Sequence, residues 1–496
     1  MDLTRPCGAV SVARVAATPA GPSPLLRTGD DGIGPGRSGA LRYPRPARDA
    51  GAAVPGAAGV AGRPRDERAR GSCVSHRARV GRGRRGLVRA ASAPGTAGTP
   101  DAGSGPARRQ PRLLIAHPSP DVYGSDRQLL ETVDGARRAG WTVQVVLPSP
   151  GPLVELLRER GATVRVVDFP VLRKALLRPG PLVGLAARGA VSVATVARGL
   201  RRLGPDVVYV NTVTIPFWLL AARLAGVPAL AHVHEAEEDQ PMLVRRALAA
   251  PFLLADEVVV NSAAARRVLL DAVPALAGRT TVVHNGVPGP PADAPPPRPR
   301  RAGDPARLAL VGRLSPRKGI DVALEAVALL VAQGRDVSLT VCGTPFPGYE
   351  WYEQELTERA ARPDLAGRVH LAGYVHPTWD VLADADVVLV PSRVEPFGNT
   401  AAEALLARRP VVASGVQGLA EVVVDGRTGL LVPAGDAPAL ASAVAALLDE
   451  PGTARRLADE GLADARRRFS TERYGRDVVA ALERCGGPST TRGTSA

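Results

Sequence analysis

The sequence predicts an α/β protein with two doubly wound, parallel β-sheets. Short apolar, β-branched runs alternate with helical stretches through most of the chain, which is typical of parallel sheets covered by helices. The alternation is interrupted at residues 286–307, where prolines are too dense for a helix or a central strand. The chain has 496 residues and is 45% hydrophobic, which is enough for two sizeable cores.

The domain boundaries follow from changes in composition. Residues 1–110 form Ala-, Gly-, Pro- and Arg-rich runs without helical or strand periodicity, so we expect a disordered tail. We expect one Rossmann-like domain over 111–287, a stiff Pro-rich linker over 288–306 and a second Rossmann-like domain over 307–470. The last helix, 471–487, is expected to pack back on the first domain.

Each domain has its own series of expected strands. In the first they are 112–117, 141–147, 162–168, 206–210, 229–234, 256–260 and 280–285. In the second they are 307–311, 337–343, 368–373, 386–390, 410–414 and 428–433. Two such domains would face each other across a cleft, which is a preferred place for a ligand.

The positive charge of the chain belongs mostly to its tail. Residues 1–110 hold 19 Arg against 7 Asp and Glu, whereas residues 111–496 hold 44 basic and 41 acidic residues. A strongly basic protein would suggest nucleic-acid binding. Because the folded part is nearly balanced, we expect no specific nucleic-acid partner.

We expect a cytoplasmic protein. Arg14 interrupts the N-terminal apolar stretch, so no signal peptide is predicted. The four cysteines favour a reducing compartment because they show neither paired nor metal-ligand spacing. The basic, apolar segment 242–254, with Arg245 and Arg246, has two interpretations: a helix at the inner membrane face serving a lipid-linked acceptor, or a buried core helix.

An anion site is predicted in the stretch PSRVEPFGNTAAE, residues 391–403. It follows a buried strand and opens a helix, and parallel α/β sheets bind ligands at such turns. Gly398 lets the backbone approach a ligand, and the N–H groups of Gly398, Asn399 and Thr400 would be free donors.

A second cationic turn follows the first strand of the second domain, in VGRLSPRKGID. Gly312 forms the turn, and Arg313 and Lys318 flank the start of the next helix. Two cations beside helix N–H groups suit a diphosphate, whose charge grows as it leaves. Lys318 is one of only two lysines beside 61 arginines. The alternative is an ordinary solvated face.

Together, VGRLSPRKG, EPFGNTAAEAL, PVVASGVQGLAEVV and GRTGLLV resemble the donor-binding half of glycosyltransferase family 4, retaining enzymes of the GT-B fold. The resemblance covers most of residues 112–487 and is strongest over 307–433. It implies two Rossmann-like domains facing across a cleft, a nucleotide diphosphate sugar as donor, a hydroxyl acceptor of unknown identity, and no metal or other cofactor.

The resemblance also implies roles for residues of the second domain. Arg313 and Lys318 match the family's basic pair that holds the diphosphate. Glu395 matches the first glutamate of the E-x7-E motif, which contacts donor-sugar hydroxyls, and Glu403 matches the second, which contacts the ribose. Carboxylates suit vicinal hydroxyls because they accept two hydrogen bonds.

Further matches are implied nearer the reaction centre. Tyr374 and Val375 lie in the segment that resembles the nucleobase contact. Gly124 lies in YGSD, which resembles the glycine-rich loop near the donor phosphate, with Asp126 where many members have glutamate. His234 matches a histidine near the donor sugar, although a histidine at a strand end can be merely structural. We expect His234, Glu395, Arg313 and Lys318 to be the catalytic residues.

One loop departs from the family pattern. Many members have two glycines before its glutamate, whereas this chain has Gln417 and Gly418 before Glu421. The contact made by that loop is therefore open.

Three alternatives remain beside the retaining glycosyltransferase. Asp384 and Asp386 spell D-x-D, which would suit a metal-dependent GT-A enzyme, but they precede their strand, whereas ligands gather beyond strand C-termini. A GT-B nucleotide-sugar epimerase would share the donor site. A non-enzymatic scaffold could bind nucleic acid or lipid through the tail.

Overall fold

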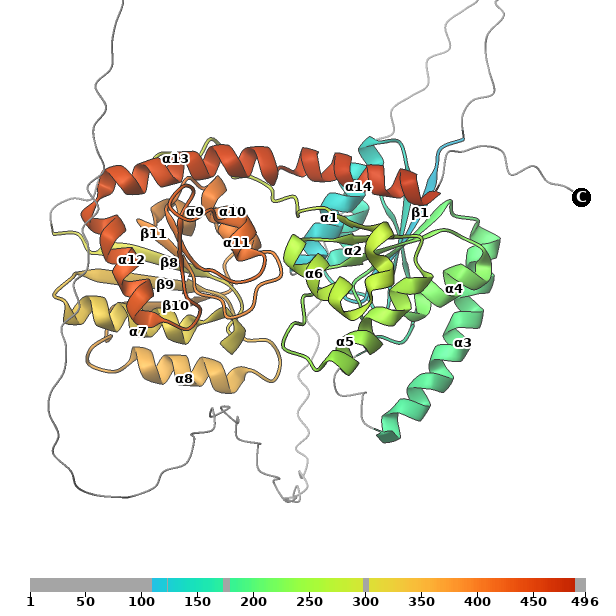
Figure 1. Ribbon diagram of the computed structural model, residues 1–496, viewed down its shortest axis with the longest axis horizontal. Helices are drawn as coiled ribbons and strands as arrows, with labels where there is room; N and C mark the ends of the chain where they lie inside the picture. Colours follow the sequence, from blue (N-terminus) through green and yellow to red (C-terminus); the bar gives the residue numbers. More distant parts are fainter. Residues whose placement is uncertain (1–108, 123, 173–178, 298–302, 487–496) are drawn as a thin grey trace, which may run out of the picture. The chain divides into compact units, whose positions relative to one another are not determined.

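The computed structural model describes residues 109–486 apart from 123, 173–178 and 298–302, and it gives only the backbone of residues 179–188. The described chain forms two purely parallel sheets (Figure 1). The predicted α/β fold with two Rossmann-like domains is confirmed. The expected tail over residues 1–110 lies almost wholly outside the described residues, as does part of the linker.

Each sheet is wound outward from a central strand. The first has the order β3-β2-β1-β4-β5-β6-β7, with β1 Arg112–Ala116, β2 Thr142–Leu147, β3 Thr163–Val166, β4 Val207–Asn211, β5 Ala229–Val233, β6 Glu257–Val260 and β7 Thr280–Val282. The second has the order β10-β9-β8-β11-β12-β13, with β8 Ala306–Val311, β9 Val337–Cys342, β10 Val369–Gly373, β11 Val387–Val390, β12 Val411–Ser414 and β13 Leu430–Val432.

Helices connect the strands and cover both faces of each sheet. In the first half they are α1 Gly124–Arg138, α2 Leu153–Glu159, α3 Pro179–Leu203, α4 Phe217–Ala225, α5 Met242–Ala249, η2 Ala250–Leu254, α6 Ala263–Ala272 and η3 Pro274–Arg279. In the second half they are η4 Pro316–Lys318, α7 Ile320–Ala332, α8 Glu350–Ala360, α9 Trp379–Asp384, α10 Asn399–Leu406, α11 Leu419–Val422, α12 Ala437–Asp449, α13 Pro451–Arg468 and α14 Thr471–Gly486.

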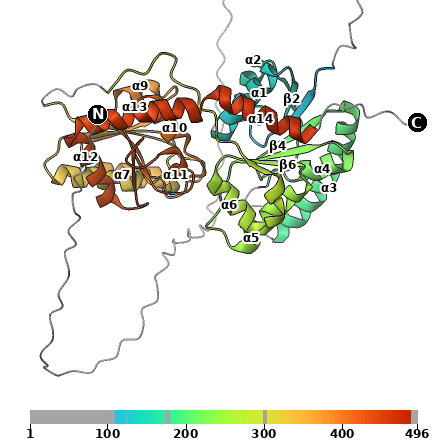
Figure 2. The same ribbon diagram turned by 45° about the horizontal axis from the view of Figure 1, so that its top comes forward.

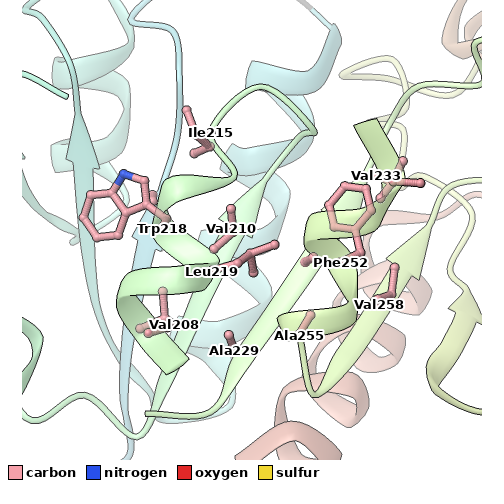
Figure 3. Packing of buried hydrophobic residues seen from close by; sticks show 14 of the residues in the cluster. Val208, Val210, Ile215, Trp218, Leu219, Ala229, Val233, Phe252, Ala255 and Val258 are labelled. Carbon is pink, nitrogen blue, oxygen red and sulfur yellow. The ribbon is translucent and has the colours of Figure 1, made fainter. Parts of the chain in front are cut away.

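The central strands of the first sheet, β1, β4, β5 and β6, are mostly apolar and buried on both faces, whereas the edge strand β3 is largely exposed. Even-numbered residues of β1 and β4 contact α3 to α6 and η2, whereas odd-numbered ones contact α1, α2 and α14. Figure 3 shows Trp218 and Leu219 of α4 and Phe252 of η2 beside Val210 and Val258 of the strands. The sheet edge formed by the strand C-termini is left for polar residues.

The second sheet follows the same rule. Leu308 and Leu310 of β8 face a core built with α7, α8 and α12, whereas Ala309 faces one built with α9, α10 and α11. Gly319, at φ 66°, connects η4 to α7. A Cβ atom built there would lie 2.0 Å from the carbonyl oxygen of Pro391. Glycine is therefore required where the two ligand-side turns meet.

The last helix, α14, packs on the first half, although α13 belongs to the second. Tyr474 and Val478 lie in the core cluster that contains β1 and α1, and Figures 1 and 2 both show α14 alongside α1. The hydroxyl groups of Tyr474 and Thr132 lie 2.6 Å apart. The first half thus takes part of its core from the end of the described chain.

A fully buried arginine stabilises the second half. Arg409 has no exposed surface. Its guanidinium donates to Leu382 O and Ala383 O at the end of α9, to Pro295 O, and to Arg408 O, at distances from 2.6 to 3.2 Å. A cation suits the C-terminal end of a helix because the carbonyls there carry negative partial charge.

Two expectations can now be compared with the structure. The buried-helix interpretation of 242–254 is wrong for α5: only Ala249 is buried, and Leu243 is 79% exposed.

Asp384 and Asp386 lie between the end of α9 and the start of β11, and a carboxylate oxygen of each is 3.8 Å from the guanidinium of Arg307. Asp386 also accepts a 2.8 Å hydrogen bond from Arg307 N. This pair connects a helix to a strand, far from the strand C-termini.

Candidate functional site

The stretch 391–403 forms a strand-to-helix turn. β11 ends at Val390, and α10 begins at Asn399, with Gly398 as N-cap at φ 111°. The first amides of a helix have no intrahelical partners, and they carry positive partial charge. A Cβ atom on Gly398 would lie 2.6 Å from Leu419 Cδ2 and 3.7 Å from Glu395 Cγ. The turn is therefore packed tightly around Glu395.

Lys318 and Glu395, predicted from two separate motifs, form an ion pair. Lys318 Nζ donates to Glu395 Oε2 at 2.5 Å, and Ser392 Oγ donates to the same oxygen at 3.4 Å. The lysine stem passes over Gly312, where an added Cβ atom would be 3.6 Å from Lys318 Cδ. The loops after β8 and β11, which are neighbours in the sheet, thus place a cation and a carboxylate together.

The two glutamates of the E-x7-E motif have opposite electrostatics. Burial raises the pKa of Glu395, but Lys318, Arg317 and hydrogen bonds outweigh it and hold the pKa below its usual value. Burial also raises the pKa of Glu403, and there Arg127 and Lys318 only partly oppose it. Glu395 is therefore held as a carboxylate.

Three other residues predicted to contact the donor follow the C-terminal ends of strands in the same parallel sheet. Thr400 Oγ1 donates to Val311 O at 3.2 Å, which fixes α10 against the end of β8. Arg313 lies over the ring of Phe346, 5.4 Å from its centroid. Tyr374 is 58% exposed just after β10. Arg313 and Tyr374 thus lie in the loops that follow β8 and β10.

Val375 and Asn399 complete the set. Val375 is partly exposed beside Tyr374. Asn399 Oδ1 accepts a 2.9 Å hydrogen bond from Asn285 of the first half. A Cβ atom on Gly124 would lie 3.7 Å from Asn399 Nδ2, so the first turn of α1 lies next to α10.

His234 lies directly after β5, in a polar cluster of the first half. Its Nε2 is 2.7 Å from Asn211 Oδ1, and its ring packs on His232 with centroids 4.0 Å apart. Burial, reinforced by the neighbouring His117, lowers the pKa of His234 to about 3, although Asp126 opposes the shift. The imidazole is therefore neutral at physiological pH.

The loop that departs from the family pattern joins the two halves. Gln417 Oε1 accepts from Glu395 N at 3.1 Å, and its Nε2 donates to Ala236 O at 3.1 Å and to a Glu238 carboxylate oxygen at 3.3 Å. Gln417 has φ 39°, a conformation that costs a non-glycine residue energy. It links the carboxylate loop to the segment following His234.

Glu421, whose contact was left open by the sequence, bonds to the first half as well. Its carboxylate accepts from Ala263 N at 2.9 Å and Ala264 N at 2.8 Å, at the start of α6, and lies 3.1 Å from His284 Nε2. Burial raises the pKa of Glu421, but His284 and these amides outweigh it and lower the pKa below its usual value.

Sequence reasoning missed His117, Asn211 and the bridging role of Gln417. A signal for the first two existed, because each is a polar residue directly at or after the end of an apolar strand. Over the described residues, no group of three or more His, Cys, Asp or Glu side chains is arranged to hold a metal ion. Among the described residues, the positive charges that act on Glu395 and Glu403 are those of Lys318, Arg317 and Arg127.

Comparison with known families matches both halves of the chain. The model for "Glycosyl transferases group 1" matches residues 305–450, and the model for "Glycosyltransferase Family 4" matches residues 122–288. The alpha-D-kanosaminyltransferase of Streptomyces kanamyceticus is 31% identical over 176 residues, which are 35% of this chain and 44% of that protein. The match thus spans less than half of that relative.

Other relatives are covered more fully. The D-inositol 3-phosphate glycosyltransferase of Stackebrandtia nassauensis is 33% identical, over 55% of this chain and 68% of its own length. The glycogen synthase of Mycobacterium tuberculosis H37Rv is 30% identical, over 54% of this chain and 68% of its own length. Among solved structures, Anabaena HepE in complex with UDP and glucose has a TM-score of 0.63 at 24% identity, covering 75% of this chain and 99% of that one.

Proposed function

Because the chain belongs to glycosyltransferase family 4, we propose that it transfers a sugar from a nucleoside diphosphate sugar to an acceptor hydroxyl. Configuration at the anomeric carbon is retained. The acceptor is a glycan, a glycolipid or a small molecule. The observation that carries the proposal is the 2.5 Å Lys318–Glu395 pair beside the N-terminus of α10. It puts a cation, a sugar-binding carboxylate and helix amides in one place.

The charges of the site suit departure of a diphosphate. In the proposed step the bond between the anomeric carbon and the phosphate oxygen breaks, and negative charge grows on the diphosphate. Lys318, Arg313 and the amides of Gly398 to Thr400 stabilise that charge without reorganising. These cations come from the protein, so the proposed reaction requires no metal ion.

The remaining predicted contacts bind the rest of the donor. Glu395 accepts hydrogen bonds from sugar hydroxyls and Glu403 from the ribose, while Tyr374 and Val375 border the nucleobase. The acceptor oxygen bonds to the anomeric carbon on the face that the diphosphate leaves. Its proton passes to the departing phosphate oxygen, so the step balances without a protein nucleophile.

A panel of nucleotide sugars tests the proposal. Residues 109–496 or the full chain would be incubated with each donor and mixed acceptors, and release of the nucleoside diphosphate measured. We expect release with at least one donor, and a glycosidic linkage in the product whose anomeric configuration, read by NMR, is the same as that of the donor. Activity should persist after treatment with a chelator. No release with any donor would contradict the proposal.

The same experiment separates the alternatives. An epimerase would release a C2-inverted sugar and no new glycoside. A scaffold would bind nucleic acid or lipid through residues 1–110, and deleting them would abolish that binding. For the proposed enzyme, the deletion leaves glycosyl transfer intact.

Peripheral membrane contact is a separate part of the proposal, supported by α5. Met242 and Leu243 are exposed there, beside Arg246. No helix among the described residues is long and apolar enough to cross a bilayer. Cosedimentation with anionic vesicles should decrease on changing Leu243 to Gln. Equal binding of the wild-type protein to neutral and anionic vesicles would contradict the electrostatic part of the proposal.

Replacing Gln417 with glycine should reduce transfer about tenfold and lower stability by about 1–3 kcal/mol, because its three hydrogen bonds are lost. The variant loses the bonds that connect the Glu395 loop to the segment after His234. Relief of the positive-φ strain, about 1 kcal/mol, is offset by the roughly 0.5–1 kcal/mol entropic cost of glycine. Turnover and the thermal midpoint would be measured together.

Arg408→Gly is the matched control for that change. Arg408 also has positive φ, 57°, but it bonds to Asp459 on the outside of the second half. The Arg408→Gly variant should have a turnover close to that of the wild type. Equal turnover in the Gln417→Gly variant and the wild type would show that the bridge is dispensable.

A further inference from the structure

Four polar side chains, three of them buried and the fourth, His234, partly exposed, form a continuous hydrogen-bonded chain in the first half. Asp126 Oδ1 lies 2.7 Å from His117 Nε2, His117 Nδ1 lies 2.7 Å from Asn211 Nδ2, and Asn211 Oδ1 lies 2.7 Å from His234 Nε2. The exposed fractions of Asp126, His117 and Asn211 are 2%, 0% and 1%. The chain runs from the first turn of α1 across the ends of β1, β4 and β5, which are neighbours in the sheet.

All hydrogen bonds in this hydrogen-bonded chain are donated in one direction. Asn211 presents its NH2 group to His117, so Nδ1 of His117 accepts and carries no proton. The ring proton of neutral His117 is then on Nε2, where it is donated to the Asp126 carboxylate. Asn211 presents its carbonyl oxygen to His234, so His234 Nε2 carries a proton. These assignments leave an unprotonated Nδ1 on His234.

A second contact fixes the ring plane of His234. The ring packs on His232 at 4.0 Å between centroids, and His232 Nδ1 is hydrogen-bonded to the hydroxyl of Tyr209. Glu235 accepts from the backbone N–H of His234 at 3.0 Å. The titratable groups around the ring are therefore His117, Asp126, His232 and Glu235. Among the described residues, the hydrogen bonds of His234 are made through its backbone N–H and Nε2, and none is made through Nδ1.

We propose that Asp126, His117 and Asn211 act as positioning residues that hold His234 as its Nε2–H tautomer. His234 Nδ1 then accepts a hydrogen bond from a hydroxyl of the sugar being transferred. The histidine orients the sugar and gives no proton to the departing phosphate. The identity of the hydroxyl rests on the proposed function, whereas the tautomer is a property of the protein alone.

The direction of the hydrogen-bonded chain depends on the acceptor at position 126. With Asp126→Leu, nothing at that position accepts the proton of His117 Nε2. His117 can move its proton to Nδ1, the Asn211 amide then turns round, and His234 becomes the Nδ1–H tautomer. With Asp126→Asn, the amide oxygen still accepts from His117. Leucine and asparagine are close in size, but only asparagine can accept the proton of His117 Nε2.

Histidine 15N NMR of the full chain tests the tautomer without substrate, with His234 signals assigned by their loss in His234→Gln. We expect an unprotonated Nδ1 and a protonated Nε2 in the wild type and in Asp126→Asn, and the reverse in Asp126→Leu. A protonated Nδ1 in the wild type, or an unchanged tautomer in Asp126→Leu, would overturn the proposal.

Turnover gives the second readout, with the nucleotide sugar that supports product formation. Asp126→Leu should lower kcat at least tenfold, and Asp126→Asn should stay within about threefold of wild type. If both variants lose activity only in proportion to the decrease in their thermal midpoints, the hydrogen-bonded chain is merely structural. If no donor is turned over, the proposed function fails, while the NMR result still decides the tautomer.

Asn211→Asp is the variant to use if Asp126→Leu does not fold. Its carboxylate still accepts from His234 Nε2, so the tautomer stays as in the wild type. The added negative charge makes His234 easier to protonate. Turnover of this variant should therefore fall toward acidic pH more than turnover of the wild type, because Nδ1 becomes protonated and no longer accepts a hydrogen bond. An unchanged acidic limb would contradict the acceptor role of Nδ1.

Discussion

Lys318→Met lowers the transfer rate by about two to three orders of magnitude, the usual effect of removing one preorganised group that stabilises developing negative charge. Methionine keeps the apolar stem over Gly312 but removes the charge next to Glu395. The measurement is kcat/KM for the donor that supports release of the nucleoside diphosphate.

Arg317→Met is the control for this variant. It removes the neighbouring positive charge of η4, which also lowers the pKa of Glu395 but belongs to an exposed side chain. Screening by water weakens exposed charges, so kcat/KM should fall less than about threefold. Full activity in Lys318→Met, or an equal loss in both variants, would show that Lys318 does not contact the diphosphate.

The stability of Lys318→Met should depend on pH. In the wild type, the lowered pKa of Glu395 gives stability that is present above its unfolded pKa and lost as pH falls through the folded value. Without Lys318, burial raises that pKa instead, and stability is lost as pH rises. The difference in thermal midpoint between variant and wild type should therefore widen as pH rises through the unfolded pKa of glutamate, about 4.3.

Arg409→Met destabilises the second half by about 2–4 kcal/mol, because buried carbonyl groups lose their donor and each unsatisfied group costs about 1–3 kcal/mol. The variant leaves carbonyl groups at the end of α9 and in the segment at Pro295 without their donor. Methionine fills much of the volume, so the loss reports mainly on hydrogen bonds. The thermal midpoint by circular dichroism measures it.

Arg335→Met is the comparison for Arg409. Arg335 donates two hydrogen bonds to Asp449, at 2.7 and 2.6 Å, but the pair is at the surface. Exposed pairs contribute at most about 1 kcal/mol. Similar losses in the two variants would mean that burial does not decide the effect.

Local patterns predicted the strands and the position of the main turn. The apolar run before residue 391 and Gly398 were enough to predict a strand, a tight turn and a helix, and the structure has β11, Gly398 at φ 111° and α10 there. These features depend on residues close in sequence, so a single chain contains the information. Fold class followed from the same periodicity.

Contacts between distant segments were not predictable in this way. Lys318 and Glu395 were assigned to different parts of the donor, and their direct pairing depends on how β8 and β11 lie side by side. Arg409 follows another arginine after a helix and looks like a surface residue. Its burial is decided by the carbonyls of α9, which the sequence does not bring near it.

The position of α14 bears on how the protein folds during synthesis. The ribosome makes strands β1 to β7 well before it makes Tyr474 and Val478, which complete their core. At about 5–20 residues per second, the delay between residues 287 and 486 is roughly 10 to 40 s. The nascent first half therefore exposes an apolar face throughout that time. It cannot finish folding before the second half is made, and a chaperone that binds this face would protect it.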